Sequence, residues 1–239
     1  MDLEILPVRR GGAAENMALD FLLLQRYPRP AVPRFRHYDW RGPAFTFGYA
    51  QKIAWVRGAL PPGEPVDLCR RPTGGGIVDH RDDWTYSLVI PRGHSLEEER
   101  ATQSYRAVHE CLAAALRAQG VPAVTQQAEA PPAPGEAVAA SGVCFQRAER
   151  YDVVHERSGE KIAGGAQKRN KRGLLFQGSL WRPATGAALD WDRLHEDLAA
   201  HLAAALQCPA VATPWPELDW EEVSGLTEQY ASPEWIESR

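Results

Sequence analysis

Residues 70–80 read Arg70-Arg71-Pro72-Thr73-Gly74-Gly75-Gly76-Ile77-Val78-Asp79-His80, and the interpretation of the whole chain starts from this stretch. Three consecutive glycines let the backbone adopt a positive φ and let a ligand approach the main chain closely. Their N–H groups can form a concavity for an oxyanion or a phosphate. Two arginines before the glycines add positive charge, and His80 can titrate near neutral pH. A flexible hairpin with solvated arginines explains three glycines equally well, and the GxxxxGK[ST] pattern of a P-loop is missing.

Strands and helices alternate irregularly on both sides of this stretch, without an internal repeat. Hydrophobic periodicity predicts strands at 3–8, 33–40, 44–50, 66–71, 84–91, 142–145, 151–155 and 173–181, and helices at 16–27, 189–206 and 220–230. Ser95 and Glu98 fit a capping box, which predicts one long helix that runs to about Gln119 and stops at Gly120. The sequence therefore predicts an α+β protein, with helices packed on a mixed or antiparallel β-sheet, in a single domain.

Composition excludes several classes of protein. Of the 239 residues, 44% are hydrophobic and 24% are charged, as is usual for globular proteins. Lys plus Arg is 27 against 31 for Asp plus Glu, which argues against a dedicated nucleic-acid binder. No run approaches the ~18 apolar residues of a membrane span, and the acidic start is unlike a secretory signal. We therefore expect a cytoplasmic monomer without nucleic-acid or membrane partners.

A second glycine-containing segment runs from Lys161 to Gln167 (Lys-Ile-Ala-Gly-Gly-Ala-Gln). Its small residues allow close approach to the backbone, and a lysine just before them can meet a carboxylate, a phosphate or a thiolate. The basic cluster that follows consists of Lys168, Arg169, Lys171 and Arg172. These four charges fit an exposed turn, or a docking patch that steers an acidic partner protein.

Cys144 differs from the other three cysteines in its setting. Cys69 lies in a strand, Cys111 on an Ala/Leu-rich helix face, and Cys208 after a helix, where free cysteine is common packing material. Cys144 follows a segment at about 128–141 that is too poor in large apolar residues to pack, and which we interpret as a mobile surface loop. An ammonium nearby, such as that of Lys161, would increase its thiolate fraction. The cysteines show no CxxC pair and no zinc spacing, so we expect no metal.

Taken together, these segments resemble the biotin/lipoate protein ligase and transferase superfamily, and most of all the cysteine-type octanoyltransferases of lipoate assembly. The motifs that carry the resemblance are Glu15–Asp20, Arg34–Tyr38, Arg70–His80, Thr85–Ser87, Val143–Phe145, Lys161–Gln167, Phe176–Leu180 and Tyr230–Trp235. Each is weak alone, but their order along nearly the whole chain is specific.

The resemblance implies one catalytic domain of the biotin/lipoate protein ligase type over residues 1–239, with a ligand tunnel under the glycine loop. Cys144 would take the octanoyl group from octanoyl-acyl carrier protein as a thioester. The acyl group would then pass to the target lysine of a lipoyl domain, in a 2-oxoacid dehydrogenase or the glycine cleavage H protein, without a cofactor. Lys161 would stabilise the thiolate and the carbonyl oxygen. The other residues expected to bind substrate are Arg71, Thr73, Gly74, Gly75, Gly76, His80, Gly164, Gly165 and Ala166.

Two further expectations concern parts of that site. Backbone N–H groups of residues 74–76 or 164–166 are candidate oxyanion donors. Tyr38, Phe47 and Leu88 could line the acyl chain, and each is equally plausible as plain core.

Departures from the transferase pattern keep alternatives open. Cysteine-type transferases have TGGR where this chain has Thr73 and three glycines, which with His80 look more like lipoate-protein ligases. In those enzymes the lysine that matches Lys161 contacts an acyl adenylate, and the reaction uses ATP and Mg²⁺. Cys144 and the lack of a large accessory C-terminal domain favour the transferase. A biotin ligase is weaker because a GRGRxG-like loop is missing. A lipoyl-domain amidotransferase also uses a cysteine here, and an inactive lipoyl-domain binding module would need neither Cys144 nor Lys161.

Overall fold

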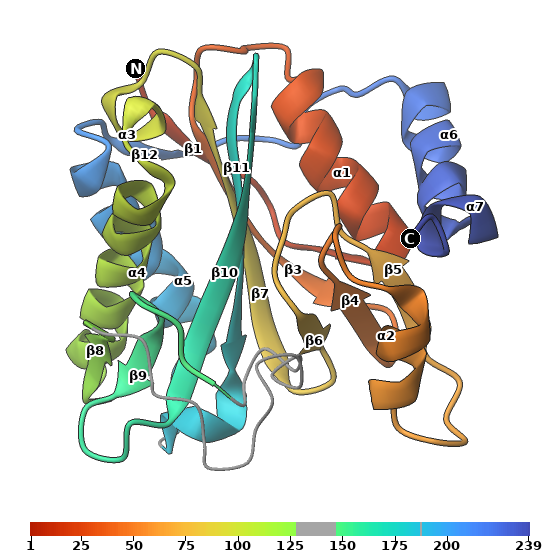
Figure 1. The fold of residues 1–239 in the computed structure, drawn as a ribbon. Helices are drawn as coiled ribbons and strands as arrows, with labels where there is room; N and C mark the ends of the chain where they lie inside the picture. Colours follow the sequence, from red (N-terminus) through yellow and green to blue (C-terminus); the bar gives the residue numbers. More distant parts are fainter. Residues whose placement is uncertain (128–146, 187) are drawn as a thin grey trace.

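The computed structural model describes residues 1–127, 147–186 and 188–239. Within these ranges a nine-stranded sheet forms the centre of the molecule (Figure 1), in the order β12-β1-β3-β7-β11-β10-β9-β8 with β2 paired to β3. Its strands are β1 (Leu3–Ile5), β2 (Arg9–Gly11), β3 (Arg34–Trp40), β7 (Asp83–Pro91), β8 (Ala123–Thr125), β9 (Val153–His155), β10 (Lys161–Asn170), β11 (Gly173–Trp181) and β12 (Ala210–Ala212). Strands β7, β11 and β10 pair antiparallel, whereas β1 pairs parallel with β3 and β12, so the sheet is mixed as predicted.

A three-stranded sheet lies beside the large one and carries the glycine loop. Its strands are β4 (Ala44–Phe47), β5 (Asp67–Arg70) and β6 (Ile77–Asp79), in the order β5-β4-β6. The glycine loop, residues 71–76, connects β5 to β6 and therefore lies at the end of this sheet.

Helices cover both faces of the large sheet. They are α1 (Ala13–Gln25), α2 (Ile53–Ala59), α3 (Ser95–Glu98), α4 (Ala101–Ala118), α5 (Trp191–Ala205), α6 (Trp220–Ala231) and α7 (Pro233–Ile236), with a 3₁₀ turn at Arg182–Thr185. Helices α4 and α5 lie on one side of the sheet, and α1 and α6 on the other (Figure 1). No helix in the described ranges is long and apolar enough to cross a membrane.

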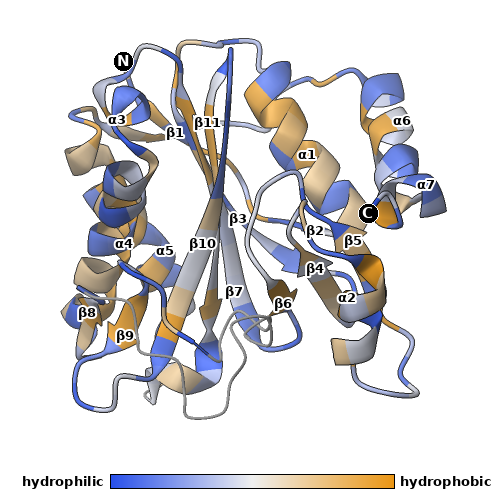
Figure 2. Cartoon of the chain, viewed as in Figure 1, coloured by the Kyte–Doolittle hydropathy of each residue, from blue (hydrophilic) through white to orange (hydrophobic). Residues whose placement is uncertain are grey.

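The two faces of the large sheet differ in chemistry because successive side chains of a strand point to opposite faces. The face toward α4 and α5 carries the main hydrophobic core, which includes Tyr86, Leu88 and Phe176. The face under α1 carries a buried polar network beside a smaller apolar cluster that includes Val89 and Leu175. There the buried Asp20 of α1 pairs with Arg36 at 2.8 Å and accepts hydrogen bonds from Ser87 (2.6 Å) and Gln177 (2.7 Å). Apolar residues mark α1, whereas the outer end of the β10–β11 hairpin is hydrophilic (Figure 2).

Two local predictions differ from the structure. The helix expected from Ser95 to Gln119 is divided into α3 and α4, because Glu99 and Arg100 adopt extended conformations. The Ser95–Glu98 capping box is wrong as well: the N-cap is His94, whose side chain accepts from the N–H of Leu96 at 3.1 Å. The helix does stop before Gly120, whose φ of +83° few other residues adopt. The expected loop at about 128–141 and the strand at 142–145 lie outside the described residues.

Candidate active site

A cavity of about 300 Å³ lies between the glycine loop and the strands β10 and β11. Helices α1 and α4 contribute Met17 and Tyr105 to its wall, and the small sheet contributes Thr46 and Val78. Its remaining walls come from the glycine loop, from the large sheet and from residues 147–152 before β9. Segments far apart in the sequence thus converge on one cavity.

Most of the residues expected at the site line this cavity. Those that do are Arg71, Gly75, Gly76, His80, Lys161, Gly164, Gly165 and Ala166. Thr73 and Gly74 are not on the wall: Thr73 donates to Gln177 Oε1 at 2.7 Å, and the carbonyl of Gly74 accepts from Arg71. Tyr38 lines the cavity, whereas Phe47 and Leu88 pack in hydrophobic cores away from it. Cys144 lies outside the described residues.

Arg71 fixes the shape of the glycine loop. Its Nη2 donates to the carbonyls of Gly74 (2.8 Å) and Gly76 (3.0 Å), and its Nη1 donates to Thr46 Oγ1 (2.8 Å). Gly75 has a φ of +90°, a conformation that other residues rarely adopt. The loop carbonyls are therefore held, while among the described residues no acceptor takes the N–H groups of residues 74–76. Unpaired N–H groups beside an arginine fit an oxyanion or a phosphate.

His80 supports Arg71 through a chain of buried hydrogen bonds. Its Nδ1 lies 2.7 Å from Asp83 Oδ2, and its Nε2 lies 2.7 Å from Thr46 Oγ1. The ring stacks on Trp40 at 3.9 Å between centroids. Both ring nitrogens are engaged, so His80 acts on a bound molecule through Thr46 and Arg71.

The ammonium of Lys161 is held inside the cavity by a carboxylate. Lys161 Nζ lies 2.6 Å from Asp152 Oδ2 and donates to the carbonyl of Arg147 at 3.3 Å. Asp152 also accepts from the hydroxyl of Tyr105 and from the N–H of Glu149 (2.7 Å). Burial, together with the charge of Asp152, raises the pKa of Tyr105 well above its usual value, so this phenol stays protonated.

The N–H groups of residues 164–166 are already used, in contrast to one of the two expectations for the oxyanion donors. The N–H of Gly165 donates to the hydroxyl of Tyr105 at 3.0 Å. Gly164 and Ala166 pair with residues 179 and 177 of β11. Hydrogen-bonded and non-hydrogen-bonded pairs alternate along an antiparallel ladder, so their N–H groups point toward β11. The glycine loop is the donor set that remains.

Residues 12–185 match the protein family described as "Lipoyl protein ligase A/B catalytic domain". The chain belongs to this family. Curated relatives named "Octanoyltransferase LipM" include one from Kyrpidia tusciae, 32% identical over 187 residues, which cover 74% of this chain and 64% of the relative. Another, from Oceanobacillus iheyensis, is 34% identical over 169 residues, covering 69% of this chain and 58% of the relative. The chain thus spans about 60% of the length of these relatives.

Solved structures share the lipoyl ligase fold over almost the whole chain. A lipoate-protein ligase A bound with ATP has a TM-score of 0.71 at 17% identity, and the match covers 99% of both chains. A bi-partite lipoate protein ligase from Thermoplasma acidophilum has a TM-score of 0.69 at 18% identity, covering 99% of this chain and 97% of that one. At these identities the likeness establishes the fold alone.

In this family member the three described thiols lie away from the cavity. Burial raises the pKa of Cys111 to about 12, and it also raises the pKa values of Cys69 and Cys208. All three are therefore protonated near neutral pH, in agreement with their expected role as packing residues. The described ranges also contain no group of three His, Cys, Asp or Glu side chains placed to hold a metal ion.

Sequence reasoning did not single out Tyr105 and Asp152 at the site, nor Thr46, which links His80 to Arg71. Tyr105 belongs to α4, 56 positions before Lys161, and no local pattern marks it. Asp152 stands just before the strand-like residues Val153 and Val154, within the segment 151–155 that was predicted as a strand. That acidic residue in front of an apolar strand was the one available signal.

Proposed function

We propose that the protein is an octanoyltransferase of lipoate assembly, which moves an octanoyl group to the target lysine of a lipoyl domain through a thioester on Cys144. The proposal is supported by the family and by curated relatives named for this activity. The observation that carries it is that a fixed ammonium, that of Lys161, and two residues of the glycine loop, Gly75 and Gly76, line one cavity.

The chemistry takes place in two exchanges at one acyl carbon. The Cys144 thiolate attacks the thioester of octanoyl-acyl carrier protein, a new C–S bond forms, and the carrier leaves as a thiolate that takes a proton. The neutral amine of the acceptor lysine then attacks the acyl-enzyme, and Cys144 leaves as the thiolate while the amine loses a proton. The first exchange is nearly isoenergetic and the second runs downhill, so no ATP is consumed.

Each charged step has a group to stabilise it. The oxyanion of either tetrahedral intermediate needs hydrogen-bond donors, and we assign this role to the N–H groups of Gly75 and Gly76, the two loop residues that line the cavity. Lys161 supplies a positive charge for the thiolate and for the developing oxyanion. Arg147, whose carbonyl accepts from Lys161, follows Cys144 by three positions in the chain.

Mass spectrometry tests the acyl-enzyme directly. Incubation with octanoyl-acyl carrier protein should add the mass of one octanoyl group, and Cys144→Ala should abolish the adduct. Cys208→Ala is the matched control, because this thiol lies outside the cavity and its loss should leave the adduct unchanged. An adduct that forms equally on Cys144→Ala would overturn the assignment.

A lipoate-protein ligase is the second candidate, and a specific observation favours it. The unpaired N–H groups of the glycine loop beside Arg71 fit a phosphate as well as an oxyanion. A ligase would require ATP, with Mg²⁺, and would release pyrophosphate when it modifies an apo lipoyl domain. Transfer from octanoyl-acyl carrier protein without nucleotide would exclude the ligase as the main activity.

The amidotransferase alternative is tested in the same assay, with an octanoylated lipoyl domain as the octanoyl donor.

The partners proposed are the acyl carrier protein and lipoyl domains. Of the basic cluster, Arg169 is engaged internally: it donates to the carbonyl of Glu97 and to Ser104 Oγ (2.7 Å). Lys171 and Arg172 are exposed at the turn of the β10–β11 hairpin.

We expect the charges of Lys171 and Arg172 to steer an acidic partner. Replacing both residues with alanine should therefore raise the KM for the partner more at low salt than at high salt. Arg193→Ala on α5 is the control, and a KM without salt dependence would remove the docking role.

A further inference from the structure

The ion pair with Asp152 restricts the ammonium of Lys161 to one position, although a lysine side chain at a cavity wall could adopt several. Lys161 and Asp152 are 2.6 Å apart, and their side chains are 7% and 1% exposed. A lysine side chain has four flexible bonds and about 2 kcal/mol of rotamer entropy, so an unpaired ammonium would sample several positions. The carboxylate selects one of them.

Asp152 is in turn held by groups that leave its carboxylate no freedom. One oxygen accepts from Tyr105, and the other accepts from the N–H of Glu149 as well as from Lys161. The hydroxyl of Tyr105 accepts from the N–H of Gly165. Lys161 and Gly165 belong to the same strand, β10, so the contacts form a closed ring through Tyr105 and Asp152. These contacts fix the position of the Lys161 ammonium relative to the backbone of β10.

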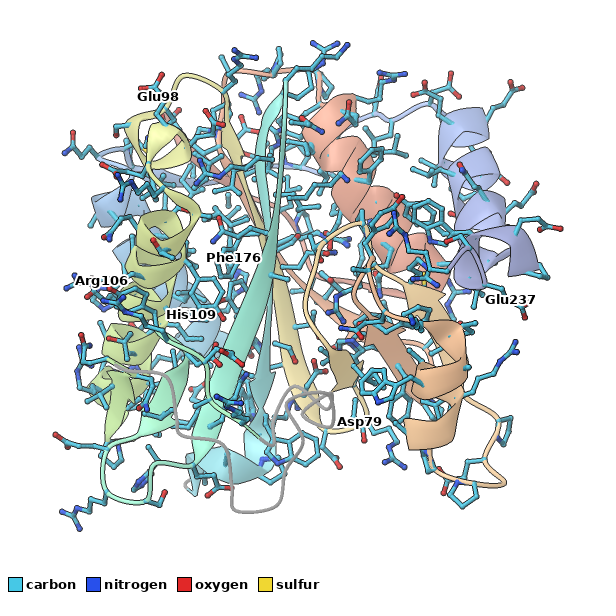
Figure 3. The ribbon with its side chains drawn as sticks, in the orientation of Figure 1. Asp79, Glu98, Arg106, His109, Phe176 and Glu237 are labelled. Atoms are coloured by element: carbon cyan, nitrogen blue, oxygen red, sulfur yellow. The ribbon has the colours of Figure 1, made fainter. Side chains whose placement is uncertain are left out.

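The backbone before Asp152 is strained in a way that orients the carboxylate. Tyr151 has a φ of +70°, and a non-glycine residue in this region costs about 1–2 kcal/mol. Two hydrogen bonds keep it there: its carbonyl accepts from His109 Nδ1 at 2.7 Å, and its N–H donates to Gln126 at 2.7 Å. His109 is buried beside Phe176, between α4 and the sheet (Figure 3). The chain thus bears strain at the residue next to the carboxylate, as is common at functional sites.

The absence of a side chain at Gly164 leaves space for the side chain of Lys161. A Cβ at Gly164 would lie 2.8 Å from Lys161 Cε and 2.9 Å from its Nζ, so any larger residue there would displace the ammonium. The glycine at this position therefore serves Lys161 on its own strand, in addition to exposing backbone to a ligand.

We propose that Asp152 is a positioning residue: it fixes the ammonium of Lys161 at one place in the cavity, and Tyr105 and the strained Tyr151 fix Asp152. The proposal rests on the proposed acyl transfer, because it gives Lys161 a reacting thioester to face. It adds a carboxylate and a phenol to the machinery that sets the geometry of that reaction.

The first test does not depend on activity. The chain has four lysines (Lys52, Lys161, Lys168 and Lys171), so the ammonium ¹H–¹⁵N signals of lysine-labelled protein are few enough to assign. Lys161 should give a slowly exchanging signal in the wild type, and Asp152→Asn should broaden or abolish it. Asp20→Asn is the matched control, because it removes an equally buried carboxylate that pairs with Arg36 instead. A Lys161 signal that is unchanged in Asp152→Asn would overturn the proposal.

The second test is a double-mutant cycle on the rate at which Cys144 is octanoylated. Asp152→Asn should slow acylation about tenfold to a hundredfold, the range of coupling between groups in direct contact. In a Lys161→Ala background the same substitution should change the rate less than about twofold, because its effect passes through the lysine. Equal losses in both backgrounds would show that Asp152 acts independently and would overturn the proposal.

Tyr105→Phe provides a milder variant if Asp152→Asn does not fold. It keeps the ring and removes only the hydroxyl, so it should broaden the Lys161 signal partly and slow acylation by a smaller factor. If no variant, including the wild type, acylates Cys144, the proposed function fails, and the lysine signal still decides whether Asp152 positions Lys161.

Discussion

His109 is a buried base whose protonation state is tied to folding. Its ring is fully buried and packs against Tyr105 at 4.3 Å between centroids. Nδ1 donates to the carbonyl of Tyr151, which leaves Nε2 as the unprotonated nitrogen without a partner among the described residues. Burial lowers its pKa to about 4, because the charged form would lose its hydration. At neutral pH the residue is therefore neutral.

The depressed pKa of His109 predicts a loss of stability in acid. In the unfolded chain a histidine titrates near pH 6.5, so between pH 6.5 and 4 the unfolded state binds more protons than the folded state. This linkage should lower the free energy of unfolding by about 2 kcal/mol between pH 7.5 and 5. Urea unfolding at a series of pH values measures it. His109→Gln should flatten that dependence, whereas exposed His201→Gln should not; equal slopes in the wild type and His109→Gln would refute the assignment.

At the scale of elements, strands β10 and β11 meet through a pair of glycines. Gly165 and Gly178 face each other across the two strands. A Cβ at Gly178 would lie 2.2 Å from the ring of Tyr86, and one at Gly165 would lie 2.7 Å from the ring of Phe176. The two rings, which stack at 6.1 Å between centroids, therefore cover the glycines on the core side. On the other side the bare backbone forms part of the cavity wall.

This packing predicts that Gly178→Ala destabilises the fold. The added methyl group must move the buried ring of Tyr86 or the strand itself, and overpacking of this kind costs about 1–3 kcal/mol. The thermal midpoint and the urea midpoint should both fall. Gly42→Ala is the control, because a Cβ there meets nothing within 4 Å. If Gly178→Ala were as stable as Gly42→Ala, the rings would not be the reason for the glycine.

The elements that sequence predicted well are those with their own periodicity, such as β3, β7, β11 and α6. Strands β2, β6 and β12 have three residues each and are defined by their partners in the sheet, so no local pattern marks them.

The candidate site also contains residues that a local sequence pattern marks and residues that no such pattern marks. Lys161 and Arg71 stand beside glycines and were predicted to meet a ligand, and both line the cavity. Tyr105 and Asp152 were missed because they reach Lys161 only through the packing of α4 and the turn before β9 against β10.

At the scale of the whole molecule, the C-terminal helix α7 is connected to the glycine loop through one buried arginine. Arg70 has no exposed surface, and its guanidinium donates to four carbonyls, those of Tyr49, Gln51, Trp235 and Ile236, at 2.7–3.1 Å. In return the indole N–H of Trp235 donates to the carbonyl of Arg70 at 2.9 Å. The family match ends at residue 185, so a segment beyond it holds the base of the loop.

This connection predicts that Arg70→Lys loosens the glycine loop and α7 together. A single ammonium cannot satisfy four carbonyls arranged around a planar guanidinium, and each buried carbonyl that loses its partner costs about 1–3 kcal/mol. Hydrogen exchange should become faster at the amides of Gly48 and Tyr49, which donate to the loop carbonyls of Gly76 and Thr73, as well as in α7. Trp235→Phe, which keeps an aromatic ring but replaces the indole and its N–H, should have the same effect more weakly. Arg57→Lys is the control, because Arg57 pairs with Glu237 on the exposed side of the same helix end. Faster exchange in α7 with an unchanged loop would mean that the C-terminal helix packs on the catalytic domain without holding its glycine loop.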